Sequence, residues 1–320
     1  MNVDGVINFL KPSGMTSHDA VGYMRRLLKI KKIGHTGTLD PMAAGVLPLC
    51  VGRGTRIVEY LIEDNKRYRC ELRLGLTTDT LDVWGVKTGG RGDIAAALSE
   101  SAIIDAVCSF TGALQQIPPM YSAVKIGGKK LYEYARKGAS IEAPPRDVYI
   151  KSIIVKKVNL CDLSLIFDVE CSKGAYIRSI CRDIGDKLGC GAVMSGLVRL
   201  NSGAFAIEDS FTADELEHAV AEGRGAELLT PIDRPLSRFI PVEIDSEDDC
   251  RKFVNGLAMN TEILRFSETA DTTNTAADKK FRDYYRVYGS FRGIERAFLG
   301  VGRIEEGKLH ADKVFIGSTI

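Results

Sequence analysis

The segment GHTGTLDPMAAGVLP, residues 34–48, is the part of the sequence from which the interpretation starts. Its glycines permit backbone conformations that other residues avoid, so we expect residues 34–45 to form a long, shaped loop. Pro41 disfavours a helical conformation at the residue before it, which holds Asp40 extended at the loop tip. The Asp40 carboxylate can then face a ligand, or it can simply accept hydrogen bonds from nearby backbone N–H groups as in an Asx-turn.

The flanking sequence predicts strands and helices on both sides of this loop. Residues 6–10 are typical of a strand, and a helix follows with Thr16 or Ser17 as its N-cap and an apolar stripe from Ala20 to Leu28. In residues 67–74 polar and apolar side chains alternate, which indicates a half-buried strand with Tyr68 on its apolar face. The remaining predicted elements are a buried segment at 46–51, helices at 55–61, 93–110 and 176–188, and a hairpin of 148–158 with 163–171.

Strands and helices alternate irregularly along the chain, without the repeating βαβ order of a doubly wound sheet. We therefore predict an α+β fold with a mixed, mainly antiparallel sheet and flanking helices over residues 1–235. After Pro235 come short strand-like pieces at 286–289, 297–304 and 314–316, which predict a small β-rich domain over residues 236–320. Residues 267–280 are polar and are expected to form a mobile loop.

Composition excludes several classes of protein. The eight cysteines lie singly, which is typical of buried free thiols, and the four histidines form no ligand cluster, so no metal site is expected. No apolar run is long enough to span a bilayer and the N-terminus lacks a secretory pattern, so we expect a cytoplasmic protein with no membrane contact.

Charge is unevenly distributed although the net charge is only +1. Residues 11–35 and 125–137 are strongly basic, whereas residues 205–250 are acidic. This asymmetry suits a polyanion bound to one face of the protein. The alternative is that the basic side chains only cover solvated helix faces.

Two other chemistries fit the loop less well. The letters TGTL occur in the phosphorylation motif of P-type ATPases, but Gly34 occupies the position of the nucleophilic aspartate there, and the chain has no P-loop. A glycosidase-like reaction needs two carboxylates flanking the bond, and no second carboxylate is evident.

Six separated motifs, in order, resemble those of the TruB family of tRNA pseudouridine synthases. The loop at 34–48 resembles the family signature G-H-T-G-x-L-D-P-x-x-x-G-x-L. The others are KPSGMTS at 11–17, KRY at 66–68, TDTLDVWG at 78–85, QIPPMYSAVK at 116–125 and SKGAYIRS at 172–179, where Ala175 replaces a commoner threonine. The resemblance extends over roughly residues 5–235. After Pro235 the chain is similar to the family only in position and general character.

This resemblance implies a pseudouridine synthase fold with a C-terminal PUA-like RNA-binding domain. It implies that the protein isomerises uridine 55 in the T-loop of tRNA without a cofactor. Asp40 would be the essential carboxylate, either attacking C1′ covalently or acting as a base at C2′ to give a glycal, and the sequence does not choose between them. Arg178 would pair with Asp40 and Tyr68 would stack on the uracil, while Tyr176 and an apolar side chain near Leu197 or Val198 would shape the pocket.

The resemblance also implies how RNA is bound. His35 would fill the space left by the flipped uridine, although a histidine at this position could equally bond the local backbone. Residues 120–145 would form an RNA-binding thumb. The expected RNA-binding side chains are Lys11, Arg25, Arg26, Lys129 and Lys130, all acting on the T-arm stem-loop, with no obligatory protein partner. The rival interpretation is an RNA-binding or tRNA-folding factor that catalyses nothing.

Overall fold

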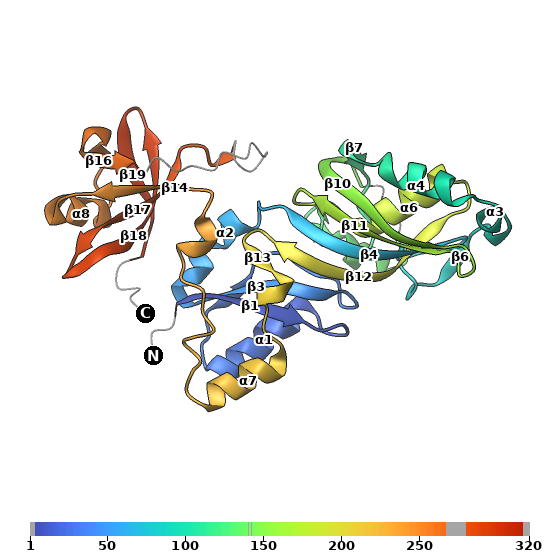
Figure 1. The fold of residues 1–320 in the computed structure, drawn as a ribbon, viewed down its shortest axis with the longest axis horizontal. Coiled ribbons are helices and arrows are strands. Elements are labelled where there is room, and N and C mark those ends of the chain that lie inside the picture. The colour runs from blue at the N-terminus through green and yellow to red at the C-terminus, as the bar shows by residue number, and fades with distance from the viewer. Residues whose placement is uncertain (1–3, 140, 142, 267–279, 316–320) are drawn as a thin grey trace.

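The computed structural model describes residues 4–139, 141, 143–266 and 280–315, and they form two units (Figure 1). The larger unit is built around a nine-stranded sheet and the smaller around a six-stranded sheet. The expected 267–280 loop lies outside the described residues, apart from Lys280.

The sheet of the larger unit is mixed and mainly antiparallel, as predicted. Its strands lie in the order β1 (Gly5–Lys11), β3 (Ala44–Val51), β12 (Ala192–Ser202), β4 (Lys66–Leu74), β11 (Ser164–Cys171), β10 (Arg146–Asn159) and β7 (Gly112–Gln116). Two short strands, β2 (Ile33–His35) and β13 (Phe205–Ala206), add to β3 and β12 respectively. Strands β3 and β12 pair in parallel, whereas the other pairings in this sheet are antiparallel.

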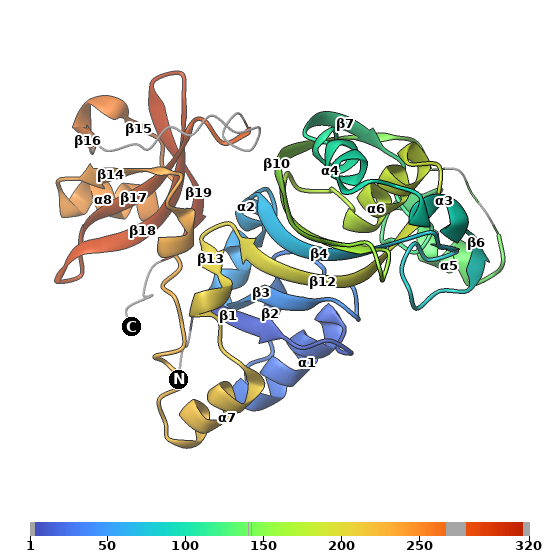
Figure 2. The ribbon, with the colours of Figure 1, turned by 45° about the vertical axis from the view of Figure 1, so that its right-hand side comes forward.

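Helices flank this sheet at two places (Figures 1 and 2). Helix α1 (Ser17–Leu28) lies with α7 (Ala213–Ala221) near β1. Helix α4 (Glu100–Cys108) packs against β10, and its neighbour α6 (Ile177–Lys187) packs against β12 and β4. One continuous hydrophobic core joins these four helices to the sheet. The shorter helical elements are η1 (Gly52–Ile57), α2 (Val58–Leu61), α3 (Gly92–Ala96), α5 (Leu131–Ala135), η2 (Ile207–Asp209) and η3 (Arg234–Leu236).

Local sequence explains where α1 begins. The Thr16 hydroxyl accepts a hydrogen bond from the Asp19 backbone N–H at 3.0 Å, and the Asp19 carboxylate accepts one from the Thr16 backbone N–H at 3.1 Å. This capping box satisfies two donors that a helix start leaves unpaired. Ala20, Val21 and Met24 are buried, as the apolar stripe predicted.

Three sequence predictions need correction. The helix expected at 93–110 is broken into α3 and α4, because Ser99 adopts an extended backbone and caps α4. The loop expected at 34–45 is shorter, since β2 and β3 pair and leave 36–43 between them. All eight cysteines are free, but Cys108 and Cys161 are exposed because they lie at a helix end and in a turn.

The smaller unit is β-rich, as predicted. Its strands lie in the order β15 (Met259–Asn260), β19 (Lys308–Val314), β18 (Ile294–Glu305), β17 (Tyr284–Phe291), β14 (Ile240–Ile244) and β16 (Leu264–Phe266), with helix α8 (Glu247–Val254) and η4 (Thr261–Ile263). The pieces expected at 286–289 and 297–304 lie inside β17 and β18. Of the piece expected at 314–316, Val314 is the last residue of β19 and Phe315 lies beyond that strand, while residue 316 lies outside the described residues.

Two hairpins project from the larger unit. One consists of β5 (Thr77–Thr78) and β6 (Lys87–Gly89), and the other of β8 (Lys125–Ile126) and β9 (Lys129–Lys130). The second hairpin precedes α5, and this hairpin and α5 share a small core formed by Val124, Leu131 and Ala143.

The two units are joined through the turn between α2 and β4. The Tyr60 ring lies 5.2 Å from that of Phe239 and 5.3 Å from that of Phe281, centroid to centroid. Glu63 is buried and forms ion pairs with Lys173 of the larger unit and with Lys280 at 2.6 Å. The smaller unit is therefore packed against the segment that leads into β4.

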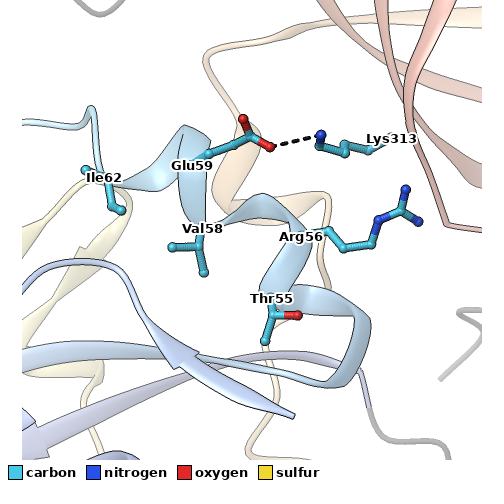
Figure 3. Close-up of a pocket in the computed structure, with 6 residues that line it drawn as sticks. All are labelled: Thr55, Arg56, Val58, Glu59, Ile62 and Lys313. Atoms are coloured by element: carbon cyan, nitrogen blue, oxygen red, sulfur yellow. Dashed lines mark ion pairs between the residues drawn. The ribbon is translucent and has the colours of Figure 1, made fainter. Parts of the chain in front are cut away.

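A hollow of about 380 Å³ lies beside this junction (Figure 3). Its lining comes from η1, α2 and β19, and Glu59 forms an ion pair with Lys313 across it at 2.9 Å. Asp40 is not part of its lining. Among the helices of the described residues, none is long and apolar enough to cross a membrane.

Candidate active site

Asp40 lies in the loop between β2 and β3 and is held there by contacts on both of its neighbours. The Leu39 backbone N–H donates to the Ser17 hydroxyl at 2.8 Å, and the Leu39 side chain is buried. The Pro41 carbonyl accepts from the Gly14 backbone N–H at 2.9 Å. The Asp40 side chain keeps 35% of its surface exposed. The carboxylate is thus fixed in place while it still faces solvent.

Arg178, from the first turn of α6, binds this carboxylate through two parallel hydrogen bonds. Its Nε donates to Asp40 Oδ2 at 2.8 Å and its Nη2 donates to Asp40 Oδ1 at 3.0 Å. Among the described residues, Arg178 is the hydrogen-bond partner found for the Asp40 side chain, so the local Asx-turn alternative is not what the structure contains. A bidentate pair of this kind fixes both the position and the rotation of the carboxylate.

Arg178 is itself held by two other loops. Its Nη1 donates to the Thr80 carbonyl at 3.1 Å and its Nη2 to the Tyr121 carbonyl at 3.0 Å, and only 5% of its side chain is exposed. Three segments that are far apart in the sequence therefore meet at one guanidinium group.

The Thr80 loop has an internal structure that explains its motif. The Thr78 hydroxyl donates to the Asp82 carbonyl at 2.6 Å, and the Thr80 hydroxyl donates to Asp82 Oδ1 at 2.6 Å. A Cβ on Gly85 would lie 2.2 Å from the Thr80 hydroxyl oxygen, so only glycine fits there. These contacts fix the backbone carbonyl that Arg178 uses.

Tyr68 lies on the face of β4 that sequence alternation predicted, within range of the charge of Asp40. It is half-buried, and burial raises the pKa of its hydroxyl, with a smaller contribution from the negative charge of Asp40. The positive charge of Arg199, which lies opposite Tyr68 in the strand register, acts in the opposite direction and lowers that pKa. The phenol is therefore protonated at neutral pH and can donate a hydrogen bond.

Lys11 has a different position from the one expected for a phosphate-binding side chain. It is fully buried, and its ammonium group donates to the carbonyls of Pro12, Met15 and Pro41 at 2.8, 2.6 and 3.3 Å. Burial, together with the charge of Arg199, lowers the pKa of Lys11 to about 8. Lys11 stabilises the Asp40 loop through its hydrogen bond to the Pro41 carbonyl. Because it is buried, it is shielded from a nucleic-acid backbone.

His35 lies in β2, half-buried, just before the loop that carries Asp40. Its Nδ1 accepts a hydrogen bond from the Gly37 backbone N–H at 3.3 Å, which is the local contact left open as an alternative. Burial and the nearby charge of Arg199 lower the pKa of His35, so the ring is neutral at neutral pH.

Tyr176 connects the site to the β8–β9 hairpin. Its backbone N–H donates to Gln116 Oε1 at 2.9 Å, and its ring packs against the small core that includes Val124 and Leu131. Leu197 is buried in the main core and Val198 is half-buried. The expected RNA-binding side chains other than Lys11 lie on the surface: Arg25, Arg26 and Lys129 are exposed, and Lys130 is partly exposed.

Sequence reasoning missed the role of two buried cations, Arg199 and Lys66. Arg199 stands in the apolar run Leu197-Val198-Arg199-Leu200, and Lys66 immediately precedes the alternating pattern of β4. A charged residue within an apolar strand is the signal that could have indicated them, because such a residue is rarely buried without a specific partner.

The arrangement can activate a carboxylate next to a planar ligand. Asp40 is oriented by Arg178, Tyr68 offers a flat ring and a hydrogen-bond donor, and the nearby buried cations favour negative charge beside them. No group of three or more potential metal ligands occurs within the described ranges.

Comparison with known proteins places this chain in a family. The model described as "TruB family pseudouridylate synthase (N terminal domain)" matches residues 25–177, and "tRNA pseudouridylate synthase B C-terminal domain" matches residues 178–237. The boundary between these matches falls inside helix α6.

Curated relatives match over nearly the whole chain. The tRNA pseudouridine synthase B of Clostridium kluyveri is 42% identical, over 98% of this chain and 100% of its own. That of Caldanaerobacter subterraneus subsp. tengcongensis is 47% identical over the same shares. Among solved structures, a chain of the "Crystal Structure of a Cbf5-Nop10-Gar1 Complex" is 25% identical, with a TM-score of 0.69, covering 98% of this chain and 85% of that chain.

Proposed function

The chain belongs to the TruB family of pseudouridylate synthases, and from that premise we propose that it isomerises uridine 55 in the T-loop of tRNA to pseudouridine, with Asp40 as the essential carboxylate. The names of its relatives support tRNA as the substrate. The observation that carries the assignment of Asp40 is its bidentate pairing with Arg178 beside Tyr68.

The reaction breaks the N1–C1′ bond, turns the uracil and joins C5 to C1′. Atoms are rearranged within one nucleoside and nothing is oxidised, so the proposed reaction needs no cofactor. An ionised carboxylate at the sugar serves either route, as a nucleophile at C1′ or as a base at C2′. In both routes Arg178 holds the two Asp40 oxygens in a fixed orientation, and the Tyr68 ring stacks on the detached base.

The target uridine is stacked within the T-loop and has to leave that stack to reach Asp40. We assign residues 120–145 to an RNA-binding thumb, because this segment carries exposed basic side chains and its Tyr121 carbonyl contacts Arg178. RNA that is bound to the thumb is thereby placed next to the carboxylate. We assign residues 1–235 to catalysis and residues 236–320 to a PUA-like RNA-binding domain.

The test uses a T-arm RNA hairpin that carries tritium at C5 of its uracils. The protein, without any added cofactor, is expected to release tritium as water from one position. A hairpin with cytidine at the position of uridine 55 should release none. Asp40→Asn should still bind the hairpin, measured by filter retention, and should release no tritium.

The matched control is Asp105→Asn, which changes an exposed aspartate of α4 and should leave release unchanged. Full activity of Asp40→Asn would refute the mechanism. Binding without turnover by the unaltered protein would instead favour a tRNA-folding factor.

A further inference from the structure

Arg199 is a buried charge with no carboxylate partner among the described residues. Its side chain is 1% exposed, its Nε donates to the Val46 carbonyl at 2.6 Å and its Nη2 to the Gly37 carbonyl at 3.2 Å. No aspartate or glutamate oxygen of the described residues lies within 4.0 Å of it. Burial of an unpaired charge is unfavourable, so a positive charge retained in this position calls for an explanation.

Two other buried cations lie close to Arg199. Lys11 and Lys66 are both buried, and in each case the charge of Arg199 contributes to a lowered pKa. Arg199 and Lys66 both approach Gly37, since a Cβ at that position would lie 3.6 Å from Arg199 Nη1 and 3.9 Å from Lys66 Cε. Like charges held close together in a buried region repel each other. The nearby Asp40 carboxylate is already paired with Arg178, so positive charge is in excess at this side of the site.

The strand register places Arg199 between the two halves of the site. On β12 it lies directly opposite Tyr68 of β4, and on its other side it pairs with Gly45 of β3. Its guanidinium group donates to carbonyls before and after Asp40 in the chain, those of Gly37 and Val46. Its positive charge also acts on the Tyr68 hydroxyl across the strand pair. One side chain therefore connects the loop that bears the carboxylate to the ring proposed to hold the base.

We propose that Arg199 is a positioning residue whose charge, acting through the Tyr68 hydroxyl, stabilises the uracil as it detaches from the sugar; this rests on the proposed function. When the N1–C1′ bond breaks, both of its electrons remain on the uracil ring, which becomes an anion. The C5 electron pair then forms the new bond to C1′. The C5 proton is lost to water and N1 gains a proton from water, so atoms and charge balance.

A purely structural role would be to tie the loop ends together, and loss of Arg199 would then slow every substrate equally. A role in stabilising the anion makes a different prediction. The loss should depend on how stable the departing base is as an anion, because a more stable anion needs less help from the protein.

The experiment compares two T-arm hairpins under single-turnover conditions, one with uridine and one with 5-fluorouridine at the target position. Fluorine withdraws electrons and makes the departing base a more stable anion. Consumption of the target nucleoside is measured by chromatography after nuclease digestion. Both hairpins are tested on the same preparation of protein, so the ratio of the two rate constants does not depend on the fraction that is folded.

Arg199→Met is expected to lower the rate constant for the uridine hairpin about 100-fold. The rate constant for the fluorouridine hairpin should fall by about tenfold or less. Arg199→Lys, which keeps the charge, should give an intermediate ratio. Leu200→Ala removes packing from the same strand without removing charge, and should slow both hairpins by the same factor.

Equal losses on both hairpins in Arg199→Met and Arg199→Lys would overturn the role of Arg199 while leaving the proposed function in place. If the unaltered protein converted neither hairpin, the proposed function would fail, and the role of Arg199 with it.

Discussion

Replacing Lys66 with methionine should change how the stability of the protein depends on pH. Lys66 is 6% exposed at the start of β4, and its ammonium group donates to the carbonyls of Ile62 and Asp64 at 2.6 and 2.5 Å. Burial lowers its pKa from the ordinary 10.5 to about 8; the charge of Arg199 adds to this, and Asp64 opposes it. The folded protein therefore releases this proton at a lower pH than the unfolded chain does.

The sign and size follow from linkage. Below about pH 8 the folded state has to keep a charge buried, which lowers its stability. Between about pH 8 and 10.5 the unfolded chain binds more protons, so stability rises with pH. With these two pKa values, Lys66 should add about 2 kcal/mol to the free energy of unfolding between about pH 7 and pH 9.5. Methionine does not titrate, so the Lys66→Met variant lacks this rise.

The assay is urea denaturation, followed by circular dichroism, of the unaltered protein and the Lys66→Met variant across this pH range. Tyrosines and cysteines that titrate at high pH occur in both proteins and cancel in the difference between them. Lys66→Arg is the matched control, because arginine stays charged throughout and should lack the rise as well. The reasoning would be refuted if the difference in free energy of unfolding between the unaltered protein and the Lys66→Met variant stayed constant with pH. It would also be refuted if the unaltered protein lost stability relative to the variant as pH rose.

Three other changes test the site. Arg178→Lys keeps the charge but loses the bidentate contact with Asp40, and should lower the single-turnover rate constant about 100-fold while hairpin binding persists; an unchanged rate would contradict the role of the pair. Gly45→Ala places a Cβ 2.3 Å from the Arg199 carbonyl oxygen at a φ of 112°, and should lower the free energy of unfolding in urea by roughly 3 kcal/mol; a stable variant would show that β3 and β12 can separate. Lys129→Ala should weaken hairpin binding and reduce the slope of log K against log salt by roughly one, measured by filter retention; an unchanged slope would remove Lys129 from the RNA contact.

The sequence predicted those elements in which local pattern and burial agree. The alternation in β4 put Tyr68 on the apolar face because each strand residue faces opposite to the next. The start of α1 followed from Thr16 and Asp19, whose capping contacts are local in the chain. The pairing of Asp40 with Arg178 was inferred from a family resemblance, and the structure contains that contact.

The features that the sequence did not predict depend on contacts between segments that are far apart in the chain. The burial of Lys11 was not predicted, because nothing in its own neighbourhood in the sequence shows that Pro41 approaches it. Arg199 was overlooked because its partners, Gly37 and Val46, lie on another strand and its loop. The small unit was only partly predicted, since strands such as β15 and β16 are too short to carry a periodic pattern.

The position of β12 also determines when the protein can finish folding during its synthesis. Strands β3 and β4 follow each other closely in the chain, yet β12, ending at Ser202, lies between them in the sheet. Until the ribosome has released β12, strands β3 and β4 each present an unpaired edge. The Asp40 loop, which leads into β3, and Tyr68 on β4 are then not yet joined in one sheet. A nascent chain shorter than this is thus both inactive and prone to pair with other chains, which makes translation speed and chaperone access over this stretch important for the yield of active protein.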